Sequence, residues 1–175
     1  MTQQATRNPE VILETTLGPI RLELFPDKAP ATVANFLAYV REGFYDGLIF
    51  HRIISNALVQ GGGFKPGLVC QDPTHPPIVN EAQNGLKNER GAIAMARAFP
   101  INSAASQFYI NVVDNPSLDH RGPGPLEFGY AVFGRVTEGM EVVDKMTWIP
   151  TGPVGEHRNV PHQDIVILKA SVVEE

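Results

Sequence analysis

The feature that most limits the possible folds is a succession of short β-prone runs separated by turn-rich stretches. The first two runs are divided only by Thr16–Pro19, which predicts a hairpin, and in the second run Ile20, Leu22 and Leu24 alternate with charged residues. This period of two is typical of a half-buried strand. Spacing of this kind favours an antiparallel barrel or sandwich over βαβ units. The runs are Val11–Thr15, Ile20–Leu24, Ile49–Ile54, Leu58–Gln60, Ala92–Ala96, Gln107–Val112, Tyr130–Arg135 and Ile165–Val173.

Two helices are expected beside these strands. Pro30 is compatible with a first helical turn, and apolar residues then recur at helical spacing up to Val40, before Gly43 ends the pattern. A second, shorter helix fits Met140–Met146. No internal repeat, linker or domain boundary interrupts the chain. We therefore predict one domain over residues 1–175, with residues 1–9 as a flexible N-terminal extension.

Length and charge exclude several classes of protein. A domain of 175 residues buries roughly 70% of the surface that its unfolded chain exposes, so a sizeable core is available. No apolar run approaches the roughly 18 residues of a membrane span, which predicts a soluble protein without a membrane partner. The 14 Lys and Arg and 19 Asp and Glu residues give a net charge of -5, with no block of either sign. This balance argues against nucleic acid as the main partner.

Cysteine usage and the N-terminal residues bear on location. Cys70 is the single cysteine, so the chain can form no intrachain disulfide, CxxC redox pair or zinc-binding cysteine cluster. Residues 1–10 are polar and contain no apolar stretch of the kind found in signal peptides. We expect a cytoplasmic monomer. The alternative is a periplasmic protein from which a signal peptide has been removed.

The densest chemical signal lies in residues 50–64. Arg52 falls among apolar residues on a predicted strand, where a guanidinium without a partner is costly to bury. Gln60 and Gln107 are placed to pair with it across neighbouring strands. We therefore expect one polar cluster on an otherwise apolar face of the barrel.

Other chemistries fit the residues less well. Gly61–Gly63 lacks the Lys-Ser/Thr pair and the spacing of phosphate-binding loops, so a close backbone approach or a bulge explains it better. The five histidines lie far apart without a carboxylate-rich ligand pattern, and we expect neither a metal nor a cofactor. We interpret His51 as structural, because it points to the opposite side of its strand from Arg52. Ser106 lies in no GxSxG turn.

Several blocks of sequence resemble one known family. They are Phe-His-Arg-x-Ile ending in Gln-Gly-Gly-Gly-Phe at residues 50–64, Ala-Met-Ala-Arg at 94–97, Ser-Gln-Phe-Tyr-Ile-Asn at 106–111, Leu118-Asp119, and Phe-Gly-Tyr-Ala-Val-Phe-Gly at 128–134. In this order, over roughly Val11 to Ala170, they resemble the bacterial cyclophilins, which are peptidyl-prolyl cis-trans isomerases. Independent blocks in one order are a more specific signal than a single short motif.

The resemblance implies a mainly β fold, a closed eight-stranded antiparallel barrel capped by two α-helices, with a substrate groove on its outer face. It also implies that Arg52 is the catalytic arginine and that Gln60 assists it. The substrate-binding positions carried over in the same way are Ala57, Leu58, Met95, Ala96, Arg97, Ala98, Gln107, Tyr109, Leu118 and Tyr130.

Prolyl isomerisation fits a chain with no obvious nucleophile or metal site. An amide twisted midway between cis and trans loses its resonance, which creates a barrier of about 18–20 kcal/mol and leaves the nitrogen lone pair as a hydrogen-bond acceptor. A guanidinium near that nitrogen binds the twisted state better than either planar state. We therefore predict an isomerase that acts on X-Pro segments of unfolded or folded proteins and assists folding. The alternative is a proline-peptide binding module or chaperone-like surface with little turnover.

Two positions depart from the pattern of the family. Residues 55–58 read Ser-Asn-Ala-Leu where the family usually carries Pro-Gly-Phe-Met, so the methyl of Ala57 replaces an aromatic wall. Asn56 is able to take the positive φ that a glycine would supply. Ser117 stands where a Trp or Phe is common. We expect both departures to lower catalytic strength and the second to weaken binding of cyclosporin, the cyclic peptide inhibitor of the family.

Overall fold

The computed structural model describes residues 7–173, so residues 1–6 of the predicted N-terminal extension lie outside it. Its α-helices are α1 (Pro30–Arg41) and α2 (Met140–Met146), and short 3₁₀ turns occupy η1 (Ala82–Asn84) and η2 (Pro116–Leu118). The strands are β1 (Glu10–Thr15), β2 (Gly18–Leu24), β3 (Arg52–Ile54), β4 (Leu58–Gly61), β5 (Phe64–Lys65), β6 (Val69–Cys70), β7 (Ala92–Met95), β8 (Phe108–Asn111), β9 (Val132–Glu138), β10 (Thr151–Val154), β11 (His157–Pro161) and β12 (Ile167–Val172). None of the described helices is long and apolar enough to cross a membrane.

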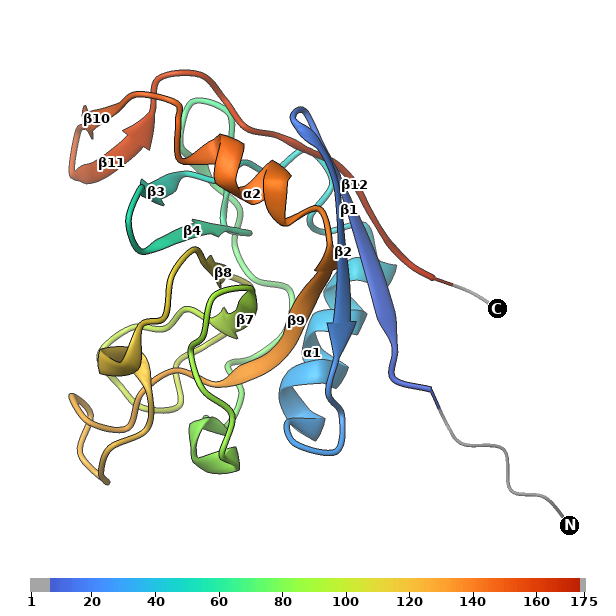
Figure 1. The fold of residues 1–175 in the computed structure, drawn as a ribbon, viewed down its shortest axis with the longest axis vertical. Coiled ribbons are helices and arrows are strands. Elements are labelled where there is room, and N and C mark those ends of the chain that lie inside the picture. Colours follow the sequence, from blue (N-terminus) through green and yellow to red (C-terminus); the bar gives the residue numbers. More distant parts are fainter. Residues whose placement is uncertain (1–6, 174–175) are drawn as a thin grey trace, which may run out of the picture.

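The main sheet has eight strands in the order β12-β1-β2-β9-β7-β8-β4-β3, and neighbouring strands run antiparallel (Figure 1). The predicted mainly β class is therefore confirmed. Full closure was overstated, because no continuous ladder joins the end strands β3 and β12. The gap is spanned by an isolated bridge between Ile49 and Val166 and by backbone bonds such as that from Phe50 N to Ile165 O (2.9 Å).

The first hairpin follows its sequence pattern closely. Val11 lies opposite Leu22 and Leu13 opposite Ile20 in the β1–β2 register, and all four side chains are fully buried. Their charged neighbours point outward, where Arg21 pairs with Glu10 (2.9 Å). The predicted half-buried hairpin is confirmed.

Helix α1 packs one face against the interior of the barrel. Phe36 is fully buried and its ring lies 5.1–5.5 Å from the ring centroids of Tyr45, Phe108 and Phe133, a spacing typical of favourable aromatic pairs. The free N–H groups at the start of the helix are capped from a distant loop, since Thr32 N donates to Glu81 (2.7 Å). Both predicted helices are confirmed.

Several predicted strand limits need correction. The run Ile49–Ile54 forms a strand only over Arg52–Ile54, because Ile49 is engaged in the bridge that spans the barrel gap. The run Tyr130–Arg135 becomes Val132–Glu138, since Tyr130 belongs to the preceding loop. The short pairs β5–β6 and β10–β11 had no counterpart in the predicted runs. The β10–β11 hairpin contains Gly152, Pro153 and Gly155, residues that disfavour strands, and it packs on β3.

Candidate active site

The site is built on the outer side of strands β4, β7 and β8. Because side chains alternate along a strand, Val59, Ile93 and Ile110 enter the main core while their neighbours face outward. The outward-facing side chains form a second, smaller cluster, which we call the outer apolar cluster: Leu58, Ala92, Ala94, Tyr109 and Val132. A folded barrel thus presents an apolar floor on its outside as well as a core within.

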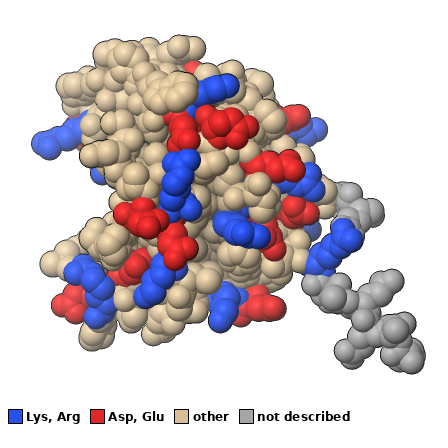
Figure 2. Space-filling view, viewed as in Figure 1, with Lys and Arg blue, Asp and Glu red and all other residues tan. Residues whose placement is uncertain are grey.

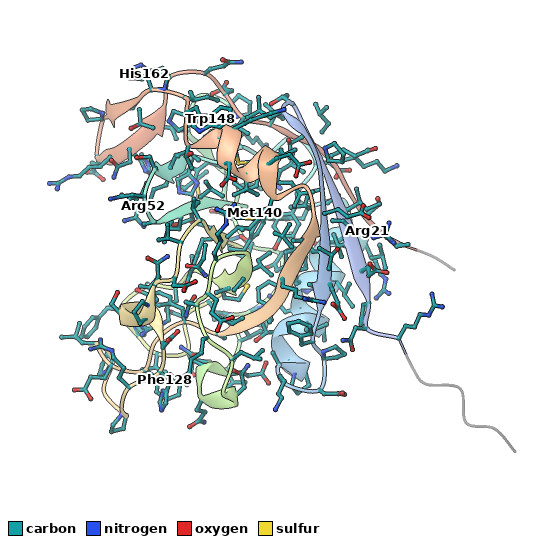
Figure 3. All side chains as sticks on the ribbon, viewed as in Figure 1. Arg21, Arg52, Phe128, Met140, Trp148 and His162 are labelled. Atoms are coloured by element: carbon teal, nitrogen blue, oxygen red, sulfur yellow. The ribbon has the colours of Figure 1, made fainter. Side chains whose placement is uncertain are left out.

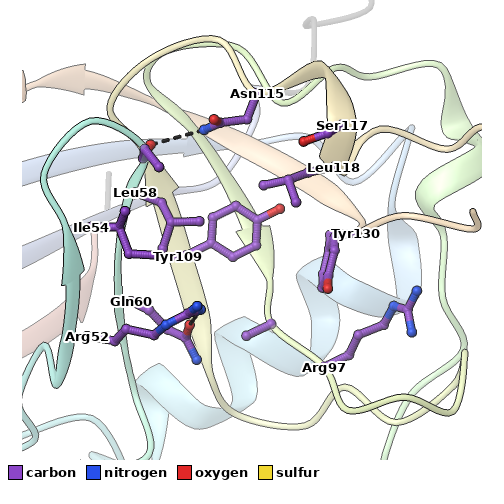
Figure 4. A pocket seen from close by; sticks show the side chains of 12 residues that line it. Arg52, Ile54, Leu58, Gln60, Arg97, Tyr109, Asn115, Ser117, Leu118 and Tyr130 are labelled. Atoms are coloured by element: carbon purple, nitrogen blue, oxygen red, sulfur yellow. Dashed lines mark hydrogen bonds between the residues drawn. The ribbon is translucent and has the colours of Figure 1, made fainter. Parts of the chain in front are cut away.

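A hollow of about 360 Å³ lies over this floor, between the β3–β4 hairpin and the loops around η2 (Figure 4). The predicted site residues that line it are Arg52, Ala57, Leu58, Gln60, Ala96, Arg97, Tyr109, Leu118 and Tyr130. Ile54 and Asn115 also line it and had not been predicted, and Ser117 joins them. The structure therefore gathers most of the predicted positions around one cavity.

Three predicted positions lie elsewhere. Ala98 and Gln107 line a second hollow of about 350 Å³, which shares Gln60, Ala96 and Arg97 with the first. Met95 is 1% exposed and packs in the main core, so its assignment to the groove is corrected. The reason is the strand alternation, because Met95 points to the opposite side of β7 from Ala94.

The expected polar cluster is present as a chain of hydrogen bonds. Arg52 and Gln60 face each other directly in the β3–β4 register, and Nη1 of Arg52 donates to Oε1 of Gln60 (3.1 Å). Nε2 of Gln60 in turn donates to Oε1 of Gln107 (2.9 Å). The cluster fixes the guanidinium at the edge of the hollow, as Figure 4 shows for Arg52 and Gln60.

The glycine triplet makes this arrangement possible. A Cβ on Gly63 would lie 2.6 Å from Nε2 of Gln107, so a side chain there would displace the Gln107 amide that holds Gln60. Gly62 has φ +92° and its Cβ would meet the carbonyl of Ser106, whose hydroxyl donates to Gly62 O (2.8 Å). The interpretation of the triplet as a close backbone approach is confirmed.

Tyr109 provides a rigid wall of the apolar hollow. Its phenol donates to Oδ1 of Asn88 (2.7 Å), and Asn88 donates from its own N–H to Asp119 (2.7 Å). Burial raises the pKa of Tyr109 well above its usual value near 10, so the phenol stays protonated and keeps its donor role. Its ring meets that of Tyr130 edge-on at 5.9 Å.

The turn that carries Ala57 is tied down on both sides. Ala57 N donates to Ile54 O (2.9 Å), and Ala57 O accepts bonds from Val112 N (2.8 Å) and from the Asn115 amide (3.0 Å; Figure 4). Asn56 is able to take a positive φ but does not do so here, and the turn closes with an ordinary backbone. The direction of the Ala57 methyl is therefore fixed toward the hollow.

Arg97 organises the far end of the hollow. Its guanidinium donates to the carbonyls of Gly129 (2.9 Å), Pro125 (2.7 Å) and Phe99 (3.1 Å), and lies 4.9 Å from the centroid of the Tyr130 ring. This cation draws two loops together. Most of its N–H groups are therefore already hydrogen-bonded to backbone carbonyls.

His51 lies behind the site. It is 5% exposed, and its Nδ1 has no hydrogen-bond partner among residues 7–173. Its ring packs 4.5 Å from that of Phe64 and 6.1 Å from that of His157 on β11. Burial, and then the charges of His157 and Arg52, lower the pKa of His51 to about 4. His51 is absent from the lining of the hollow, which agrees with the structural role predicted for it.

The fold and the hollow together define a class of protein. The lining residues offer apolar side chains, amides, hydroxyls and two guanidinium groups, but no carboxylate, thiol or imidazole. Such a surface is suited to an apolar ring with a neighbouring amide, toward which its positioned hydrogen-bond donors can point. It is the arrangement of an outer-groove β-barrel that binds proline-containing peptides.

Comparison with known proteins makes the assignment specific. The model of the cyclophilin type peptidyl-prolyl cis-trans isomerase/CLD family matches residues 10–172, and this chain belongs to that family. It is 51% identical over 164 residues to peptidyl-prolyl cis-trans isomerase B of Escherichia coli, covering 94% of this chain and 99% of that one. It is 52% identical over 163 residues to the isomerase cyp18 of Streptomyces antibioticus, covering 93% and 98%.

A solved structure agrees with these relatives. A cyclophilin type isomerase of Cryptosporidium parvum superposes with a TM-score of 0.80 at 26% identity, covering 96% of this chain and 99% of that one. The same isomerase has been solved in the presence of the dipeptide Ala-Pro. This chain is therefore a peptidyl-prolyl cis-trans isomerase, as the sequence predicted.

Proposed function

We propose that this isomerase binds the proline ring of its substrate on the outer apolar cluster and that Arg52 stabilises the twisted prolyl amide. The observation that carries the proposal is the bond between Arg52 and Gln60 at the edge of the apolar hollow. Leu58, Tyr109 and Leu118 surround the ring in this arrangement. The prolyl nitrogen then lies toward Arg52.

The guanidinium is suited to this role because one of its N–H groups holds it in place while the others remain available to donate. Gln60 is its single hydrogen-bond partner in the part of the chain described here, and Gln107 holds Gln60 in turn. The remaining N–H groups of Arg52 are free to donate to the nitrogen lone pair, which exists as an acceptor only in the twisted amide. The bond therefore forms in the transition state and adds little to binding of either planar isomer.

The substrates in this proposal are X-Pro segments of unfolded chains and of exposed loops in folded proteins. The open hollow and the adjoining second hollow accept an extended chain on either side of the proline. The solved relative has been crystallised in the presence of the dipeptide Ala-Pro, and an X-Pro unit is the ligand proposed for this chain. Uncatalysed X-Pro isomerisation takes tens to hundreds of seconds, so catalysis relieves a slow folding step.

Replacement of Arg52 tests the proposal. In a protease-coupled assay on an X-Pro peptide, Arg52→Ala is expected to lower kcat/KM about 100-fold or more, the cost typical of losing one positioned donor. Thermal stability should change little, because the side chain is exposed. Arg41→Ala, an equally exposed cation at the end of α1, serves as the matched control and should keep wild-type activity.

Arg52→Lys refines the same test, because it keeps the charge but loses the planar donor array. It should remain strongly impaired. NMR exchange spectroscopy on the same peptide measures turnover without a protease and also detects binding without turnover. Near-wild-type activity of a folded Arg52→Ala variant would overturn the role of Arg52. If the wild-type protein binds the peptide but does not turn it over, the binding-module alternative is favoured.

Three further properties stay proposals. We expect a monomer, to be checked by light scattering, and weak binding of cyclosporin, because Ala57 and Ser117 leave two sides of the hollow without aromatic walls. A cytoplasmic location rests on the single cysteine, and fluorescence of a tagged chain in its native host checks it.

A further inference from the structure

Two large apolar side chains stand exposed beside the groove. Phe99 is 67% exposed and Leu126 is 78% exposed, which places both among the most exposed apolar residues of the described chain. We call this pair the apolar rim. Single exposed apolar residues are common on protein surfaces, so their exposure alone would mean little.

The two rim residues are held close together by one side chain. The guanidinium of Arg97 donates to Phe99 O (3.1 Å) and to Pro125 O (2.7 Å), the residue directly before Leu126. Two acceptors held by the two terminal nitrogens of one guanidinium lie within about 8 Å of each other. The backbones that carry Phe99 and Leu126, which are distant in sequence, therefore lie near each other at the Arg97 end of the hollow.

The rim is built on ordered loops. The Ser103 hydroxyl accepts from Ala98 N (2.9 Å) and donates to Pro100 O (2.6 Å), which fixes the loop of Phe99. On the other side, Arg121 donates to Leu126 O (3.1 Å). The exposed side chains are thus presented from a fixed backbone, which reduces the entropy lost when a ligand covers them.

The rim adjoins the two hollows through Arg97, and Phe99 and Leu126 themselves lie outside the linings of both. Arg97 lines both hollows and lies 4.9 Å from the Tyr130 ring centroid, which is 5.9 Å from that of Tyr109. An extended chain advances about 3.3 Å per residue. A polypeptide whose proline contacts Tyr109 therefore reaches the rim with a residue about two to four positions from that proline.

We propose that Phe99 and Leu126 bind an apolar side chain of the substrate polypeptide, about two to four residues from the proline, and so favour unfolded chains. The inference rests on the proposed placement of the proline over the outer apolar cluster. Unfolded segments are the fitting partner because they expose apolar residues next to X-Pro bonds, which folded proteins bury. The rim would then give unfolded clients an additional contact that short peptides lack.

The test compares a short X-Pro peptide with longer peptides that carry Leu or Ser at each position two to four residues before or after the proline. For the wild type, Leu at one of these positions should raise kcat/KM about five-fold over Ser. The double variant Phe99→Ser/Leu126→Ser should lose this gain while turning over the short peptide within two-fold of the wild-type rate. The single variants should each lose part of it.

Trp148→Ser is the matched control. Trp148 is 73% exposed and lies two residues after the end of α2. Phe128 is two residues from Leu126 of the rim, and in Figure 3 Trp148 and Phe128 lie on opposite sides of Arg52. This variant should keep the full gain from Leu. Absence of any gain in the wild type, or the same gain in the double variant, would overturn the proposal.

The two proposals fail in different ways. If Arg52 lacks the proposed role, the Arg52 variants turn over the short peptide at near-wild-type rates. If the rim lacks its proposed role, only the ratio of kcat/KM between Leu and Ser peptides reveals it. Binding of the same peptides, measured by fluorescence anisotropy, reports on the rim without depending on turnover. An affinity of the wild type for the Leu peptide about five-fold higher than for the Ser peptide, with a smaller difference in the double variant, supports the rim proposal. Equal affinities for the two peptides refute it.

Discussion

Restoring an aromatic side chain at Ala57 tests how the proline hollow works. Ala57 lines the hollow next to Ile54 and Leu58, and its backbone is held by bonds to Ile54, Val112 and Asn115. A Phe at this position therefore projects along the direction that the methyl now takes. Ala57 lines a hollow of about 360 Å³, which gives an added ring open space to enter.

The expected magnitude follows from the area that the ring buries. Full burial of a Phe side chain is worth roughly 1.5–3 kcal/mol, and one face of the ring against a substrate proline realises about half of it. A gain of about 1 kcal/mol corresponds to a roughly five-fold higher kcat/KM. Because the ring contacts planar and twisted prolines alike, KM should fall while kcat changes less.

The measurement is steady-state isomerisation of one X-Pro peptide by the wild type, Ala57→Phe and Ser55→Phe. Ser55 lies in the same turn but outside the lining of the hollow, so its variant adds the same ring without the contact and should behave like the wild type. Thermal unfolding checks that each variant is folded. An unchanged or lower kcat/KM for folded Ala57→Phe would refute this description of the hollow.

Three other predictions concern acid stability, inhibitor binding and substrate charge. The pKa of buried His51 falls to about 4 from 6.5, so the unfolded state takes up the proton first and wild-type stability should drop by up to about 3 kcal/mol between pH 6.5 and pH 4. Urea unfolding at pH 7 and pH 4.5 should show that His51→Gln loses less free energy of unfolding on acidification than the wild type, whereas the exposed control His162→Gln should behave like the wild type. Equal losses in the wild type and His51→Gln would contradict this. Ser117→Trp should tighten cyclosporin binding at least ten-fold in calorimetry, whereas nanomolar affinity of the unchanged protein would show that the wall at Ser117 is not needed. Peptides with Glu two or three residues before the proline should be turned over better than those with Lys, by less than about five-fold, because Arg97 is partly solvent-exposed and its donors are occupied; a preference for Lys would count against it.

Local patterns were enough for the elements whose partners lie nearby in sequence. The alternation in β2 and the helical spacing before Val40 each report burial of one face, and both elements form as predicted. The limits of β3 and β9 were wrong because Ile49 and Tyr130 take their conformation from distant loops. The Met95 error was avoidable, since the alternation with Ala94 already pointed it inward.

The sequence by itself determined the residue types of the site and their order: the arginine, its two glutamines, the glycine triplet and the apolar residues of the hollow. Ordered motifs carry this information because the side-chain chemistry and the strand period are local properties. Only the tertiary structure decided what holds them in place. Asn115 reaches Ala57 across 58 residues and Arg97 reaches Gly129 across 32, and no local pattern encodes such contacts, because they exist only once the chain has closed around its core.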